Sequence, residues 1–131
     1  MIIRVREFKI GEAPYAVRQR YCDGDLRPGD KHEAHSVAVY EGRSSFLIVE
    51  GKDRDRTCWY PAWFFDVVDP QCADDWILMT FREEPSLVIG PPCVAASIEN
   101  YVAIASCEYP QYGQFWERLR QRTPKEPDDE S

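Results

Sequence analysis

TCWYPAWFFDVVDP, residues 57 to 70, is the most densely apolar stretch of the sequence and decides the expected fold. It contains two of the four tryptophans and two of the six phenylalanines. Aromatic and β-branched residues favour strands, but Pro61 lacks the N–H group that an uninterrupted central strand needs. We therefore predict an extended segment over residues 57–60, a turn or a single 3₁₀ turn over 61–63, and a second short strand over 64–68.

Length and composition predict one folded domain. The chain has 131 residues, of which 44% are hydrophobic and 13% aromatic, so it can bury a core. We expect a single domain over residues 1–122. No apolar stretch approaches the length of about 18 residues that a membrane-spanning helix needs, and the first residues alternate between apolar and charged. We expect a cytoplasmic protein that does not engage a membrane.

The charge of the chain favours a protein partner over a nucleic acid. The net charge is −7 and the isoelectric point is near 4.8. Direct binding of nucleic acid needs clustered Lys and Arg, which an acidic chain does not supply. A basic protein is the partner that this charge would attract.

Segments on both sides of the central stretch predict a β-rich front half. We expect further strands over residues 2–10 and 15–22, a loop over 23–30, a hairpin over 36–40 and 45–50, and a strand over 76–81. Residues 87–89 suit either a short edge segment or an extended lead-in. Together these elements predict a small twisted antiparallel sheet within residues 1–81.

The last part of the chain changes to helical periodicity. Apolar residues at spacings of three and four predict helices over residues 94–106 and 110–122, within a helical part that spans 91–122. In the second of these helices, Arg118 is expected to point outward. Residues 123–131 contain two prolines and four acids, so we expect a disordered acidic tail. The predicted fold class is therefore α+β.

Three short motifs in the front half carry a resemblance to a known family. The motifs are LRPGD at residues 26–30, the hairpin over 36–50, and WYPAWFFDVVD at 59–69. Together they resemble the SH3-like barrel over roughly residues 15–70, and this resemblance implies that Phe64 takes the family's aromatic position and Phe65 a buried one. The acidic aromatic repeat and the paired tryptophan of eukaryotic SH3 domains are absent. The resemblance therefore implies the barrel, but not the groove that binds proline-rich peptides.

The only two histidines are the strongest candidates for a metal site or a catalytic base. They occur in His32-Glu33-Ala34-His35, a spacing that places both imidazoles on one side of a helical turn. We prefer a second interpretation, in which both are surface histidines on the approach to a strand and hold no metal. A small enzyme would use Cys22 with His32 or His35, or a metal held by that pair.

Other catalytic or cofactor-binding patterns do not occur in the sequence. It contains no Gly-rich phosphate loop, no G-x-S-x-G and no H-E-x-x-H. The five cysteines include no Cys-x-x-Cys pair, so we expect free, mostly buried thiols and neither a disulfide framework nor a zinc ribbon. We therefore expect a protein that is not an enzyme and that needs no cofactor.

Aromatic and acidic residues occur together at two places, and this composition is typical of a partner-binding surface. The predicted contact residues are Trp63, Asp66, Asp69, Asp74, Asp75 and Trp76. In size, charge and order of elements the chain also resembles the immunity proteins of bacterial polymorphic toxin systems. That resemblance implies an inhibitor of the toxin–antitoxin kind, which occludes a basic surface of its partner. The alternatives are the small Cys/His or metal-dependent enzyme and an SH3-like structural or phage accessory protein.

Overall fold

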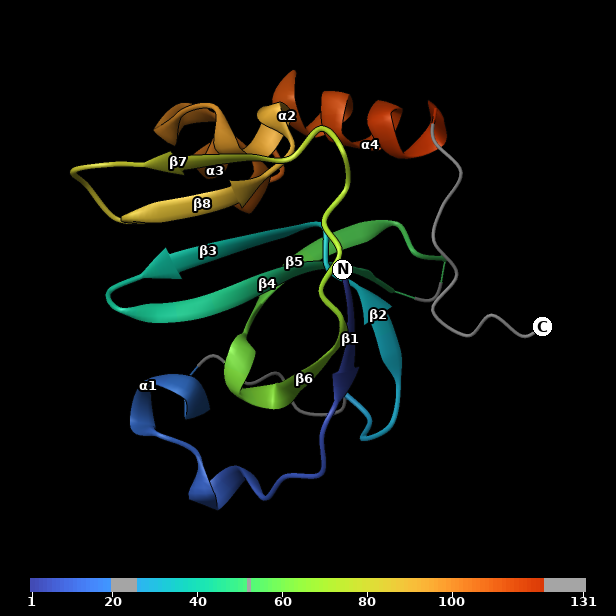
Figure 1. Cartoon of the computed structure of the whole chain (residues 1–131), viewed down its shortest axis with the longest axis vertical. Coiled ribbons are helices and arrows are strands. Elements are labelled where there is room, and N and C mark those ends of the chain that lie inside the picture. The colour runs from blue at the N-terminus through green and yellow to red at the C-terminus, as the bar shows by residue number, and fades with distance from the viewer. Residues whose placement is uncertain (20–25, 52, 122–131) are drawn as a thin grey trace.

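The computed structural model describes residues 1–19, 26–51 and 53–121, and these residues form an α+β fold (Figure 1). The α+β prediction is confirmed. The elements, in chain order, are β1 Ile2–Val5, the 3₁₀ helix η1 Ile10–Glu12, α1 Tyr15–Arg18, β2 Lys31–Glu33, β3 Ser36–Tyr40, β4 Arg43–Glu50, β5 Arg56–Pro61, the 3₁₀ helix η2 Ala62–Phe64, β6 Phe65–Asp69, β7 Ile77–Thr80, β8 Leu87–Gly90, α2 Pro92–Ala95, α3 Ile98–Ala105 and α4 Gln111–Gln121.

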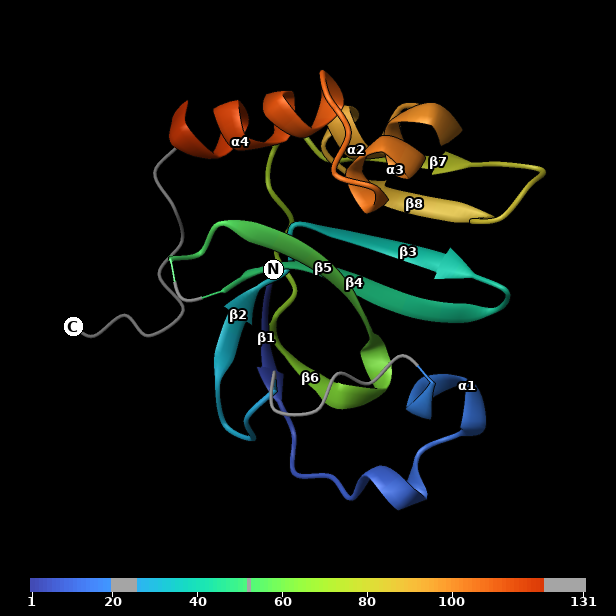
Figure 2. The same ribbon diagram turned by 180° about the vertical axis from the view of Figure 1, so that it is seen from behind.

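Two antiparallel sheets organise the described part of the chain. The smaller sheet has the strand order β2-β1-β6, and the larger has the order β5-β4-β3-β8-β7. Consecutive strands form the β1–β2, β3–β4, β4–β5 and β7–β8 pairs, whereas the β1–β6 and β3–β8 pairs join strands that are far apart in the chain. The three C-terminal helices lie on the far side of the larger sheet from the smaller one (Figures 1 and 2).

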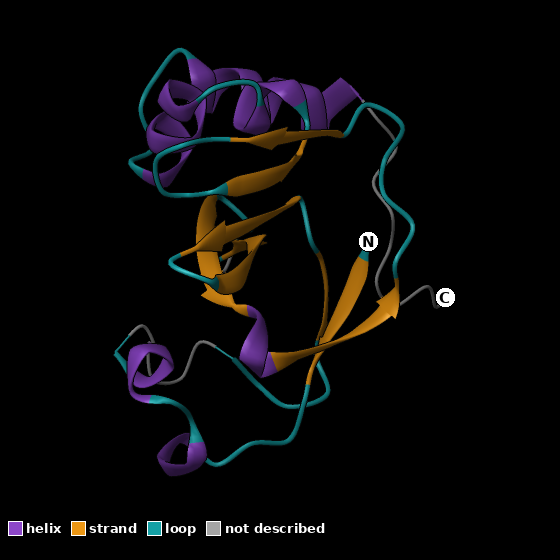
Figure 3. Cartoon of the chain, turned by 60° about the vertical axis from the view of Figure 1, so that its left-hand side comes forward, coloured by secondary structure: helices purple, strands orange, loops and turns teal. Residues whose placement is uncertain are grey.

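The larger sheet separates two hydrophobic cores. One core lies between the sheets, and the other lies between the larger sheet and the helices, which gives the layers seen in Figure 3. Strand β4 supplies both cores, because successive side chains of a strand point to opposite faces. Phe46 and Ile48 belong to the first core, whereas Leu47 belongs to the second.

The stretch that decides the expected fold adopts the predicted strand, 3₁₀ turn and strand. It comprises most of β5, the whole of η2 and the whole of β6. Pro61 is compatible with β5 because β5 is the last strand of its sheet and, among the described strands, pairs with β4 alone. Tyr60 and Phe64 are fully buried in the first core. The predicted hairpin over β3 and β4 and the predicted strand at β7 are confirmed as well.

Two predictions for the N-terminal region are wrong. The first strand ends at Val5 instead of continuing to residue 10, and residues 15–18 form the short helix α1 instead of a strand. Pro14 precedes α1 with φ −57° and ψ 151°, so its fixed φ starts a helical turn. The end of that predicted strand, residues 20–22, lies outside the described residues, as do residues 23–25 of the predicted 23–30 loop.

Predictions for the C-terminal region need two corrections. Residues 87–90 form β8, which lies between β3 and β7 and is therefore an interior strand. The single helix expected over 94–106 is divided into α2 and α3, because Ser97 is extended, at φ −156°, and its Oγ accepts a hydrogen bond from the N–H of Asn100 at 3.1 Å. The second predicted helix is confirmed as α4. The predicted tail, residues 123–131, lies outside the described residues.

Candidate functional site

The predicted contact residues lie along one continuous segment, which consists of η2, β6 and the loop to β7. Between residues 64 and 81 the sequence has four aspartates and no Lys or Arg. In Figure 1 this segment leaves the smaller sheet at β6 and passes beside the larger sheet to reach β7. The segment therefore brings negative charge to one side of the molecule.

Strand β6 has an open outer edge within the described part of the chain. It is the last strand of the smaller sheet, and β1 is the only described strand that pairs with it. Asp66, Val67 and Val68 are exposed in succession, and the two valines keep 50% and 42% of their surface. We call these three residues the β6 edge. Consecutive exposed side chains show that solvent reaches both faces of the strand here.

Trp63 lies at the start of this segment and packs within its own chain. The Arg6 guanidinium lies 4.2 Å above the Trp63 ring, and Arg6 Nε donates a hydrogen bond to the Trp63 carbonyl oxygen at 2.5 Å. The ring also makes edge contacts with Phe8 and Phe64, with centroids 5.9 and 5.3 Å apart. Trp63 is therefore a half-buried side chain against the first core, at the opposite end of β6 from Asp69.

Asp75 is paired with a cation of its own chain. Arg118 Nε and Nη2 each donate to one Asp75 carboxylate oxygen at 2.6 Å. Only 14% of the Arg118 side chain is exposed, so the expectation that it points outward from α4 is wrong. This hydrogen-bonded pairing raises the pKa of Arg118 above its ordinary value. The sequence pattern gave no signal for this contact, because the spacing of α4 placed Arg118 on the charged face.

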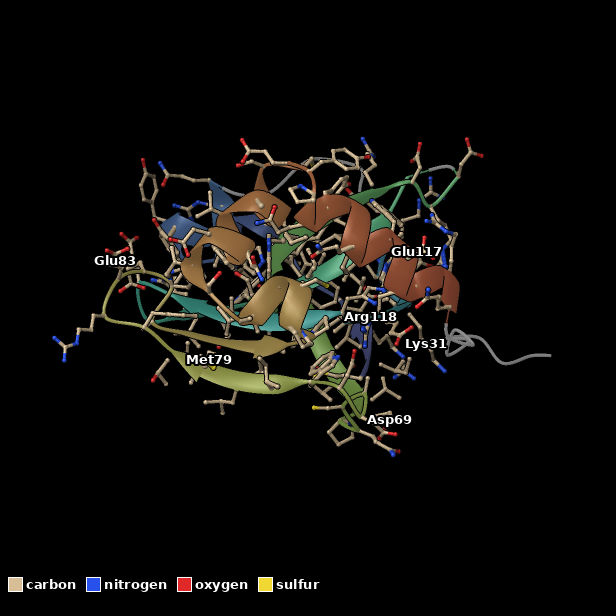
Figure 4. All side chains as sticks on the ribbon, turned by 90° about the horizontal axis from the view of Figure 1, so that it is seen from above. Lys31, Asp69, Met79, Glu83, Glu117 and Arg118 are labelled. Atoms are coloured by element: carbon tan, nitrogen blue, oxygen red, sulfur yellow. The ribbon has the colours of Figure 1, made fainter. Side chains whose placement is uncertain are left out.

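The remaining predicted contact residues differ in their exposure to solvent and in their hydrogen bonds within the chain. Asp74 is exposed, and Trp76 is half-buried immediately before β7. The Asp69 carboxylate accepts a hydrogen bond from the N–H of Gln71 at 3.0 Å, so it helps to shape the loop. Figure 4 shows Asp69 at the rim of the molecule, with Arg118 further inside. Asp66 and Asp74 are thus the exposed carboxylates that the structure leaves for a partner.

His32 and His35 do not form the pair that a helical turn would produce. Residues 31–33 are strand β2, and the His32 ring lies against Phe65, 6.4 Å away, whereas the buried His35 ring lies against Phe115, 5.7 Å away. Phe65 belongs to the first core and Phe115 to the second. Within the described ranges, no group of three or more His, Cys, Asp or Glu side chains could hold a metal ion. The description of both histidines as surface residues is also wrong for His35.

The described cysteines do not provide an activated thiol. Cys58 and Cys93 are half-buried, whereas Cys72 and Cys107 are exposed, so the prediction of mostly buried thiols is wrong for two of them. All four are free. Burial raises the pKa of the Cys93 thiol, which opposes formation of the nucleophilic thiolate. Cys22, the predicted nucleophile of the enzyme alternative, lies outside the described residues.

No protein-family model matches the sequence, and no curated protein or solved structure matches it significantly. Among the described residues, none of the helices has both the length and the apolar character that spanning a membrane requires.

Proposed function

We propose that this chain is a non-catalytic protein-binding module whose β6 edge, together with Asp74, docks on a basic surface of a partner protein. The observation that carries the proposal is the succession of Asp66, Val67 and Val68, exposed on a strand that no described strand covers on its outer side. Exposed valines offer apolar area for burial, and the neighbouring carboxylates favour a partner of opposite charge.

The charge distribution supports this choice of surface. The Arg118 guanidinium neutralises Asp75, so Asp66 and Asp74 supply the exposed charge of a segment that has no cation from residue 64 to residue 81. Charges of this kind increase the rate of association with a basic surface and depend on ionic strength. An inhibitor of the immunity type would use such a surface to occlude a basic groove of a toxin.

We also propose that the front of the chain is an SH3-like barrel. The order of strands supports this: β3, β4 and β5 pair in succession, η2 follows β5, and β6 then pairs with β1, which also pairs with β2. The burial of Phe65 in the first core agrees with the buried position that the family's pattern gives it. The accessory-protein alternative would use this same barrel.

The enzyme alternative receives less support. His32 and His35 contact different cores, and the Cys93 thiol has a raised pKa. A shared metal or a Cys–His pair needs side chains that converge on one point, which these described residues do not do.

Charge reversal tests the proposed surface. We would tag three proteins, the wild type, the D66K/D74K variant and the E7K/E12K control, and use each to capture partners from native lysate at low and high salt. Glu7 and Glu12 are exposed and lie outside the acidic segment, so the control changes the net charge equally. We expect the wild type and the control to capture the same basic protein at low salt, and D66K/D74K to lose it.

Association rates then test the role of charge. With the captured protein in hand, D66K/D74K should associate at least tenfold more slowly than the control at low salt, and the difference should shrink as salt is added. Equal capture and equal rates for the two variants would overturn the proposed surface.

A further inference from the structure

We propose that the partner binds the β6 edge as an added β-strand, and that the added strand is an extended basic segment with β-branched apolar residues between its cations. This inference rests on the proposed function and specifies its partner. Strand addition uses the backbone hydrogen-bonding groups of an open sheet edge for affinity and the neighbouring side chains for selection.

The direction of the backbone groups along β6 follows from the hydrogen bonds around β1. The N–H of Arg6 donates to the carbonyl oxygen of Phe64 at 2.9 Å, so the Phe64 carbonyl points toward the residue that follows β1. Val5 lies opposite Phe65, but its N–H donates to Asp30 and its carbonyl oxygen accepts from Gly29, both on the other side of β1.

Alternation along an antiparallel strand then fixes the remaining groups. Residues opposite one another alternate between pairs that exchange hydrogen bonds and pairs that do not. Since Val5 and Phe65 exchange no hydrogen bonds, the register assigns the backbone groups of Asp66, opposite Arg4, to β1. The N–H and C=O groups of Val67 and the C=O group of Phe65 consequently point to the outer edge, where an added strand would bind them. The N–H of Phe65 donates to the carbonyl oxygen of Ala62.

The side chains of the edge select the chemistry of that strand. Asp66 would face a Lys or Arg of the partner, and Val67 and Val68 would face β-branched residues. Cross-strand pairs of these kinds stabilise neighbouring strands. A second copy of this chain is disfavoured, because it would bring its own Asp66 and Asp69 to the same edge. Natural proteins place charges on edge strands to prevent such self-association.

A synthetic peptide tests strand addition directly. We would titrate ¹⁵N-labelled full-length protein with the capped peptide Ser-Lys-Val-Thr-Val-Lys-Ser and follow amide chemical shifts. We expect saturable shifts centred on residues 65–68 with a Kd below about 1 mM, which corresponds to about −4 kcal/mol. A peptide in which both lysines are replaced by glutamate should bind at least tenfold more weakly. Absence of saturable shifts at β6, or equal binding of the glutamate peptide, would overturn the inference.

N-methylation distinguishes strand addition from charge attraction alone. One peptide would carry N-methyl groups on both valines, and the other on the two lysines and the threonine. Only one of these alternating sets of N–H groups can face β6, so methylation of that set should weaken binding at least tenfold and methylation of the other set should not. Equal affinities of the two methylated peptides would contradict strand addition.

A variant of the protein supplies the reciprocal test. Val67→Pro removes an outward N–H group while leaving the bonds between β1 and β6 in place, and Val67→Thr retains the N–H as the matched control. We expect V67P to bind the peptide at least tenfold more weakly and V67T to bind within threefold of the wild type, with the β1 amide signals preserved in both. Wild-type affinity in V67P would overturn the inference, as would dimerisation of the wild type through this edge.

These results are separable from those of the proposed function. If V67P captures the natural partner normally while D66K/D74K does not, strand addition is wrong and the acidic docking surface stands. If D66K/D74K captures the partner normally, the proposed surface itself is wrong.

Discussion

Arg118 of α4 and Asp75, which precedes β7, form a two-pronged ion pair with both N–O distances at 2.6 Å, although they are 43 positions apart. The guanidinium is largely buried and the carboxylate is about half exposed. The pair connects the last helix to the loop that follows β6. It also removes one of the four aspartates of the acidic segment from the charge available to a partner.

Replacing Asp75 by alanine should destabilise the fold. The Arg118 guanidinium would lose its carboxylate while most of its surface stays buried, and we expect a loss of about 1–2 kcal/mol after allowance for the exposure of Asp75. The control is Asp74→Ala, whose side chain is exposed and for which we expect a change within about 0.5 kcal/mol. Urea unfolding measures both. Equal midpoints for the two variants would show that the pair contributes no stability.

Acidification should destabilise the protein partly through His32. Burial lowers the pKa of His32 below 6.5, the nearby Asp30 carboxylate opposes this, and Arg54 adds to it. Above pH 6.5 the imidazole is neutral in both states and has no effect. As the pH falls through 6.5, the unfolded chain takes up a proton that the folded protein resists, so stability falls.

The free energy of unfolding at pH 7.5 and pH 5.5 tests this prediction. Wild type should lose more stability across this interval than His32→Gln. The difference between the two pH values is the quantity to compare, because the substitution also removes the packing of His32 on Phe65 at every pH. An equal or larger loss in the variant would show that His32 does not contribute.

Cys93 should react with alkylating reagents more slowly than the exposed thiols. Burial raises its pKa and restricts access, whereas Cys72 and Cys107 are exposed. Brief treatment with iodoacetamide at pH 8, followed by peptide mass spectrometry, should find Cys72 and Cys107 modified first. Faster modification of Cys93 would indicate an activated thiol and would favour the enzyme alternative.

Gly90 should not tolerate a side chain, because β8 lies close to β3 there. A Cβ atom on Gly90 would lie 2.4 Å from Ser36 Oγ and 2.9 Å from Ser36 Cβ. We expect Gly90→Ala to cost roughly 1–3 kcal/mol, whereas Gly11→Ala has open space and serves as the control. In a double-mutant cycle, Ser36→Gly should reduce the cost of Gly90→Ala by at least half. An unchanged cost in the Ser36→Gly background would contradict the steric explanation.

Local sequence patterns correctly predicted those elements in which residue propensity, spacing and turn residues all favour the same secondary structure. The aromatic run interrupted by Pro61 gave β5, η2 and β6, and the glycine between two short apolar runs gave the β3–β4 hairpin. Periodicity failed at Ser97, where a side-chain cap starts a new helix inside a continuous apolar pattern. It also failed after Pro14, where aromatic spacing suggested a strand and the fixed φ of proline favoured a helical turn.

Some features of the candidate site likewise follow from local sequence, whereas others depend on tertiary contacts. The sequence by itself determined the α+β class, the acidic segment without cations and the strand character of residues 65–69, because composition and period-two patterning act over a few neighbouring residues. Only the tertiary structure decided that Trp63 packs beneath Arg6, that Arg118 neutralises Asp75, that His32 and His35 contact different cores, and that β6 ends its sheet within the described residues. Each of these depends on contacts between segments far apart in the chain or on which strand lies next to which, and no local pattern encodes that placement.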